Sequence, residues 1–188
     1  MKNLIKSSVL GLFLLTACTS LMVQTDFDTS YNFSKLKTYA WLEDKAPSDD
    51  IRINNSLIIK RVVNAVNHNL QSRGYTLVSK DKADFFVNWF GYIRNRIQQE
   101  TIDSYYTHPG YTVTTWEHSA FSRTYTFEYQ EGTLIIDILD SNSGQLIWRG
   151  TGRDYLEENE TPEKITERIN RTVAGILKNF PPGRQQAH

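Results

Sequence analysis

Residues 132–150 read GTLIIDILDSNSGQLIWRG, and this stretch decides the fold. Two apolar runs flank a cluster of turn-forming residues from Asp140 to Gly144. Leu, Ile and Trp suit packed strands, whereas Asp, Asn, Ser and Gly favour tight turns. The stretch therefore predicts an antiparallel hairpin, with one strand over residues 132–140 and the next over residues 145–150.

Two amphipathic helices flank this hairpin along the chain. The first begins near residue 57, after three possible capping residues (Asn54, Asn55 and Ser56), and its apolar residues recur every three or four positions up to Gly74. The second begins at Thr161-Pro162, a cap followed by a proline that suits the first turn. Its apolar stripe ends at Phe180, before two prolines.

The remaining strand-like segments complete the prediction of the fold. They lie at residues 22–28, 38–42, 75–78, 83–97 and 123–129. Together these elements predict an α+β fold, with a mostly antiparallel sheet of about six strands and two amphipathic helices packed on one face. We expect a single domain over residues 22–182 and a flexible tail over residues 183–188.

The N-terminus reads as a lipoprotein signal. Lys2 and Lys6 precede a short apolar run, which is too short for a membrane-spanning helix. Leu15-Thr16-Ala17-Cys18 matches a lipobox and resembles the substrates of bacterial prolipoprotein processing. That resemblance implies removal of residues 1–17 as a signal peptide and attachment of acyl chains, palmitate among them, to Cys18. Residues 18–21 would then form a lipidated tether.

The same resemblance implies an address in the cell envelope. Aspartate after the lipidated cysteine usually keeps a lipoprotein in the inner membrane, and here the residue is Thr19. We therefore expect a protein anchored in the outer membrane and facing the periplasm.

Composition limits the partners of the mature chain. Without residues 1–17, 19 basic residues stand against 21 acidic ones. The chain has no basic stripe, so a nucleic-acid partner is not expected. It has no polybasic run either, so membrane attachment is expected to rest on the acyl chains. Cys18 is the only cysteine, so we expect packing and not disulfides to stabilise the domain.

No catalytic or metal-binding pattern is readable, so we expect neither an enzyme nor a cofactor. Asp84 and Asp137 suggest a carboxylate pair, but we interpret them as strand-face residues or as partners of a turn. By strand alternation Trp148 should pack inward and Arg149 should point outward. The four histidines lack zinc-ligand spacing and are interpreted as surface residues: His68, His108, His118 and His188.

Residues 101–121 lack a clear period and contain four aromatic residues that are candidates for partner binding: Tyr105, Tyr106, Tyr111 and Trp116. In one interpretation they are anchors on an exposed partner-binding loop. In the other, strands over residues 101–107 and 111–117 flank a His-Pro-Gly turn and bury the same rings in the sheet. We favour the second.

Several short motifs carry a resemblance to a known family. They are Asp26-Phe27-Asp28, residues 33–41 (FSKLKTYAW), Gly74-Tyr75, Ala83-Asp84, residues 132–137 (GTLIID), residues 146–150 (LIWRG) and Phe180-Pro181-Pro182. In this order and spacing the chain resembles bacterial lipoproteins of the domain-of-unknown-function 4136 family. The resemblance supports the domain boundaries and an envelope address, and it implies no reaction.

The sequence therefore favours a membrane-anchored envelope lipoprotein whose domain is non-catalytic and serves in binding or scaffolding. Its expected partners are the membrane, through the acyl chains, and another envelope protein or a cell-wall component. The alternative hypothesis is a carrier that holds a small apolar or amphipathic ligand in a pocket between sheet and helices.

Overall fold

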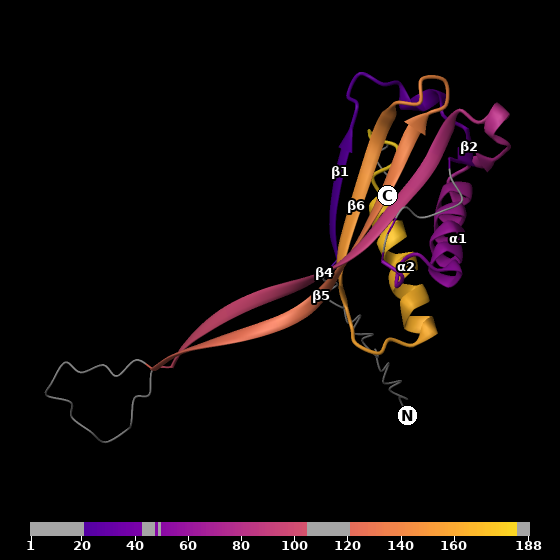
Figure 1. Ribbon diagram of the computed structural model, residues 1–188. Helices are drawn as coiled ribbons and strands as arrows, with labels where there is room; N and C mark the ends of the chain where they lie inside the picture. Colours follow the sequence, from indigo (N-terminus) through magenta and orange to yellow (C-terminus); the bar gives the residue numbers. More distant parts are fainter. Residues whose placement is uncertain (1–20, 43–47, 49, 105–120, 184–188) are drawn as a thin grey trace, which may run out of the picture.

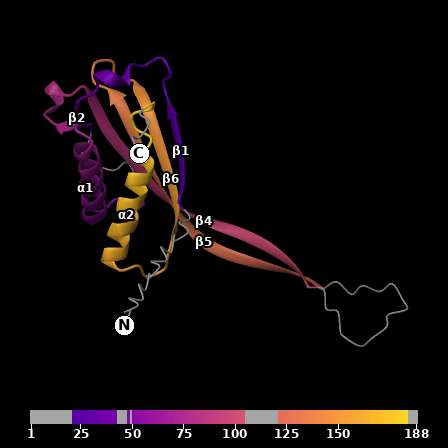
Figure 2. The same ribbon diagram turned by 180° about the vertical axis from the view of Figure 1, so that it is seen from behind.

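A computed structural model describes residues 21–42, 48, 50–104 and 121–183. Its sheet has six strands in the order β1-β6-β5-β4-β2-β3. The strands are β1 (Met22–Phe27), β2 (Thr38–Trp41), β3 (Thr76–Leu77), β4 (Phe85–Ser104), β5 (Phe121–Asp140) and β6 (Leu146–Leu156). Helices α1 (Ser56–Ser72) and α2 (Pro162–Leu177) cover one face of this sheet (Figures 1 and 2).

This architecture confirms the predicted fold class. The pairs β1–β6, β6–β5 and β5–β4 are antiparallel, while β2 runs parallel to both β4 and β3. The predicted hairpin of residues 132–150 lies inside the sheet, between β1 and β4, where β5 and β6 meet through a turn. The face that carries no helix is called the outer face below.

Both helices start where the sequence places them. The Asn55 side chain accepts hydrogen bonds from the backbone N–H groups of Leu57 and Ile58, so Asn55 is the cap among the three candidates. Thr161 caps α2 by accepting from the N–H of Lys164. These side chains satisfy backbone donors that a helix start leaves without an intrahelical partner.

Aromatic rings fill the core between sheet and helices. Phe180 is 2% exposed. Its ring centroid lies 5.2 Å from that of Trp148, 5.6 Å from that of Tyr75 and 5.7 Å from that of Phe85. Phe33 adds a fourth ring at 6.3 Å. Phe180 therefore joins the end of α2 to three separate parts of the sheet and its connections.

Two glycines of β6 let α2 approach the sheet closely. A β-carbon at Gly150 would overlap the side chains of Ile176 and Trp148, and one at Gly152 would lie 2.8 Å from Thr172 Cγ2. Because real β-carbons essentially never approach so closely, the packing of Trp148 under α2 depends on glycine at these positions.

The prediction of separate strands at residues 123–129 and 132–140 is wrong, because β5 runs without a break from Phe121 to Asp140. Gln130 and Glu131 stay in the ladder and pair with Asn95 and Arg94 of β4. Apolar residues switch sheet faces at this point, from Phe127 and Tyr129 on the outer face to Leu134, Ile136 and Ile138 on the helix-covered face. In the sequence this change of face looks like the end of one strand and the start of another, although the backbone of β5 stays extended throughout.

The paired strands β4 and β5 continue beyond the body of the sheet as a two-stranded arm (Figure 1). β6 ends opposite Gln130, and β2 ends opposite Val87. From Arg96–Tyr129 to Ser104–Phe121, the two strands pair with each other alone among the described residues, over a length of roughly 30 Å. We call residues 96–104 and 121–129 the arm.

Candidate functional site

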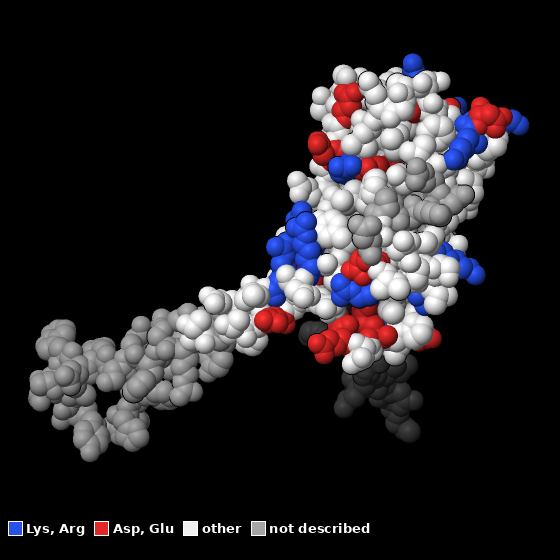
Figure 3. Space-filling model, viewed as in Figure 1, with Lys and Arg blue, Asp and Glu red and all other residues white. Residues whose placement is uncertain are grey.

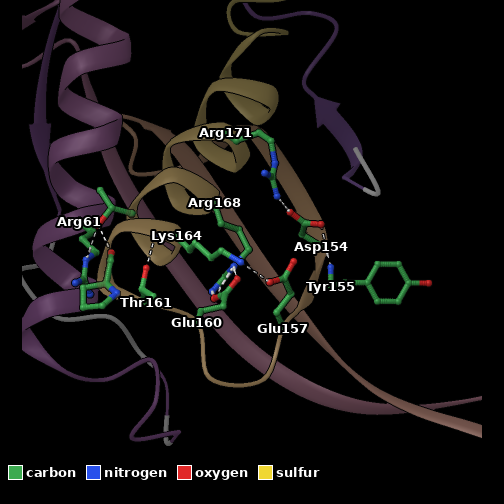
Figure 4. Close-up of polar contacts among 11 residues, drawn as sticks. Arg61, Asp154, Tyr155, Glu157, Glu160, Thr161, Lys164, Arg168 and Arg171 are labelled. Carbon is green, nitrogen blue, oxygen red and sulfur yellow. Dashed lines mark hydrogen bonds and ion pairs between the residues drawn. The ribbon is translucent and has the colours of Figure 1, made fainter. Parts of the chain in front are cut away.

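Exposed aromatic residues line the outer face where the arm leaves the body. Phe127 and Tyr155 are 51% and 46% exposed. The ring centroids of Tyr129 and Tyr155 lie 4.6 Å apart, and burial followed by the contact with Tyr155 raises the pKa of the Tyr129 hydroxyl. Figure 4 shows the ring of Tyr155 directed away from α2, so it lies on the face that the helices leave open.

Arginines surround these rings. The guanidinium carbon of Arg94 lies 4.7 Å from the centroid of the Tyr92 ring, within cation–π range. Arg96 forms an ion pair of 3.0 Å with Glu131. Arg153 stands on β6 opposite Thr133 and Met22. Figure 3 shows basic side chains gathered on the body beside the start of the arm.

The first residues of the described chain reach the same corner. Met22 pairs with Arg153 and is 63% exposed. Leu21 packs against α2, where a β-carbon at Gly175 would lie 2.8 Å from Leu21 Cδ2. We call the resulting patch the arm-base surface; it consists of Met22, Tyr92, Arg94, Phe127, Arg153 and Tyr155.

A cleft of about 250 Å³ opens on the other side of the sheet, between α1, α2 and the strands. Its lining is mostly apolar and includes Ile58, Val62, Trp89, Leu134, Leu156 and Ile165. Gly91 and Gly132 contribute to it from the sheet, beneath Ile53 and Leu156. The cleft is slightly smaller than most ligand pockets, which begin at about 300 Å³.

Ion pairs hold the residues at one side of this cleft (Figure 4). Arg168 and Glu160 approach to 2.6 Å, and their side chains are only 20% and 10% exposed. Arg171 binds Asp154 at the same distance. The Arg171–Asp154 pair therefore joins α2 to β6, and the Arg168–Glu160 pair joins α2 to the connection that precedes it.

One protein family matches the sequence over almost the whole described domain. The matching description is "Domain of unknown function (DUF4136)", and the match covers residues 23–182. The chain belongs to the DUF4136 family. This finding confirms the family resemblance, and no curated protein matches the sequence.

Three solved structures are similar to this DUF4136 chain to different degrees. A PDZ domain protein from Parabacteroides distasonis has a TM-score of 0.54 at 15% identity, and the match covers 88% of this chain but only 37% of that one. A DUF4136 family protein from Bacteroides thetaiotaomicron has a TM-score of 0.48 at 18% identity, with coverage of 86% and 96%. A PelC dodecamer from Paraburkholderia phytofirmans scores 0.42 at 9% identity, with coverage of 84% and 94%. At 15% identity the likeness to the PDZ domain protein concerns the fold alone.

The family motifs of this DUF4136 chain hold structural positions. Asp84 accepts hydrogen bonds from the backbone N–H groups of Lys37 and Thr38 at 2.9 and 2.8 Å. Burial alone would raise the pKa of Asp84, but these N–H groups outweigh it and lower the pKa. Asp84 therefore binds the backbone where the chain enters β2.

Asp137 and Arg149 form a two-pronged ion pair on the outer face, with N–O distances of 2.7 and 2.6 Å. Trp148 is 1% exposed on the opposite, helix-covered face. The inward Trp148 and outward Arg149 are thus confirmed. Asp84 and Asp137 lie at different places, since Asp84 precedes β4 and Asp137 stands opposite Asn88. The structure does not bring them together as a carboxylate pair.

Other candidates lie outside the described residues. These are Cys18, Tyr105, Tyr106, Tyr111, Trp116, His108, His118 and His188. His68 lies exposed on α1. Within the described ranges, no group of three or more His, Cys, Asp or Glu residues could hold a metal, and no helix is long and apolar enough to cross a membrane.

The arm-base surface was missed in the sequence. Its residues come from β1, β4, β5 and β6, and their grouping follows only from the register of these strands. Alternation over residues 123–129 indicated that Phe127 and Tyr129 share a face. Arg94 and Arg153 stand far apart in the chain, so no basic run revealed them.

Proposed function

We propose that the mature protein is a lipid-anchored lipoprotein of a bacterial cell envelope, held in the outer membrane and facing the periplasm. The observation that carries this proposal is the lipobox ending at Cys18, the only cysteine of the chain. Its position supports the proposal further, because only three residues separate Cys18 from Met22, the first residue of β1. Such a short tether suits a domain held close to a membrane.

We infer that the domain is non-catalytic and serves in binding or scaffolding. Both carboxylates considered for catalysis are engaged in structure: Asp84 binds the backbone at the start of β2, and Asp137 binds Arg149. The arm offers an extended surface that suits a partner better than a reaction. Turnover of a hydrolase substrate by the purified protein, abolished by replacing one polar residue, would contradict this inference.

Acylation can be tested by feeding cells an alkyne analogue of palmitate. We expect the wild-type protein to incorporate the label and Cys18→Ser to incorporate none, because serine has no thiol for the lipid. Thr19→Asp is the matched control: it changes the neighbouring residue and should keep the label. Equal labelling of wild type and Cys18→Ser, or no labelling of either, would refute the anchor.

The cleft favours a second candidate function, the carriage of a small apolar or amphipathic ligand. Ile165 lines the cleft from α2. We expect Ile165→Phe to fill part of this space and to abolish the fluorescence of a bound apolar dye, N-phenyl-1-naphthylamine, while the melting temperature holds. Asn170→Phe, at an exposed position of the same helix, should leave the fluorescence unchanged. If wild type and Ile165→Phe bind the dye equally, the cleft is not a ligand site.

A further inference from the structure

We propose that the arm-base surface is the face that the domain lays against anionic phospholipid of the membrane holding its acyl anchor. This inference rests on the proposed acylation of Cys18. It adds a second, non-covalent membrane contact, with an orientation: the outer face of the sheet toward the bilayer and the helices away from it.

The tether brings this surface within reach of the lipid. Between Cys18 and Leu21 the extended chain spans about 10 Å at most. Leu21 is fixed by its packing near Gly175 of α2, and Met22 already belongs to the arm-base surface. A lipidated Cys18 therefore keeps this corner of the molecule close to the headgroups, whatever the rest of the domain does.

The chemistry of the surface suits a bilayer interface. Tyrosine has an apolar ring and a polar tip, which favours the headgroup level. Phe127 and Met22 add apolar area at 51% and 63% exposure. Arg94 and Arg153 have no carboxylate partner among the described residues and can pair with lipid phosphates. Two membrane signals together hold a protein far more firmly than one.

The distribution of charge determines which side faces the lipid. On the outer face Glu131 stands opposite Arg94, but its carboxylate is already paired with Arg96. Other carboxylates lie on the connection from β6 to α2 and on the first turns of that helix: Glu158, Glu163 and Glu167, together with Glu157, which is paired with Lys164. An anionic surface repels the three carboxylates that form no ion pair among the described residues, and it attracts Arg94 and Arg153.

The arm supplies a reason for such a contact. A two-stranded ribbon alone in water is only marginally stable. One face of the arm continues the aromatic row of the body through Tyr129 and Phe127. Contact of that face with the bilayer would bury the exposed ring of Phe127 and stabilise the start of the ribbon.

The single cysteine makes a direct test possible. When Cys18 is acylated the mature protein has no free thiol, so a cysteine introduced by substitution is the only site for a maleimide fluorophore. Labels are placed by Phe127→Cys and Tyr155→Cys on the arm-base surface and by Asn64→Cys on the exposed side of α1. The acylated proteins are reconstituted into vesicles of phosphatidylethanolamine and phosphatidylglycerol that contain a spin-labelled quencher lipid.

We expect lipid quenching at positions 127 and 155 to exceed that at position 64 several-fold. Equal quenching at all three positions would overturn the proposal. Flotation of the vesicles in a density gradient tests the anchor separately: a protein that floats with them is still anchored, and one that does not float shows that the anchor has failed.

Charge reversal tests the role of the arginines. Arg94→Glu with Arg153→Glu should lower quenching at position 127 to the level at position 64. Lys60→Glu with Lys178→Glu makes the same change of net charge on the helix side and should have no effect. Raised salt should weaken quenching at position 127 when both arginines are kept. This tests the electrostatic attraction without a charge-reversing substitution that could disturb folding. Indifference to salt and to the lipid charge would overturn the electrostatic part of the proposal.

A photo-crosslinker at position 127 in intact cells separates lipid from protein. Phe127→p-benzoylphenylalanine keeps an aromatic ring at this site. Adducts with phospholipid support the proposal, and adducts confined to an envelope protein would overturn it in favour of a protein interface.

Discussion

Replacing Gly150 with valine is expected to lower the free energy of unfolding by about 3 kcal/mol or more. The added β-carbon would overlap Ile176 and Trp148, which are 0% and 1% exposed and have no free space to move into. Relief of the overlap requires α2 to move away from the sheet or Trp148 to leave its place in the core. Urea unfolding followed by circular dichroism measures the loss.

The control for this substitution is Thr151→Val in the same strand. Thr151 faces the opposite side of the sheet, so valine there replaces a side chain of similar size and does not meet α2. We expect a change of no more than about 0.5 kcal/mol. If Gly150→Val proved as stable as Thr151→Val, the close contact between α2 and β6 would be wrong.

Replacing Phe180 with alanine is expected to cost about 3 to 5 kcal/mol. The substitution removes a ring that contacts four other aromatic residues, with centroid distances from 5.2 to 6.3 Å. The space left behind is enclosed by the sheet and by the end of α2, so it cannot easily collapse. Thermal and urea unfolding should both show the loss.

Phe127→Ala is the matched control, because the same ring is removed from a position that is 51% exposed. We expect a cost of about 1 kcal/mol or less. Similar losses for both variants would mean that Phe180 does not join the parts of the core as described.

The body of the fold was predictable because its local signals agree with its packing. Asn55 and Thr161 cap the helices that follow them, and the turn from Asp140 to Gly144 joins β5 to β6. The Trp148-Arg149-Gly150 motif gave the faces of its first two side chains. Its glycine was not explained by the sequence, since the need for it comes from Ile176, in a distant helix.

The arm was predicted only in part: residues 123–129 were expected to form a strand, but its continuity with residues 132–140 was not expected, because the apolar residues of β5 change faces at Gln130 and Glu131. When the apolar alternation along a strand shifts by one residue, the sequence looks as if the strand ends. In fact the strand continues, and its apolar residues only move to the other face of the sheet. The arm-base surface escaped for a related reason: Arg94, Arg153 and Tyr155 become neighbours only once the strands pair. Cys18, in contrast, is a candidate that the sequence alone identifies.

The mass of the intact mature protein, extracted from membranes, tests the central claim most directly. The account predicts an N-terminal Cys18 that carries a diacylglyceryl group and a further acyl chain, with residues 1–17 absent. A chain with an unmodified thiol at residue 18, or one recovered in full from the soluble fraction, would contradict it.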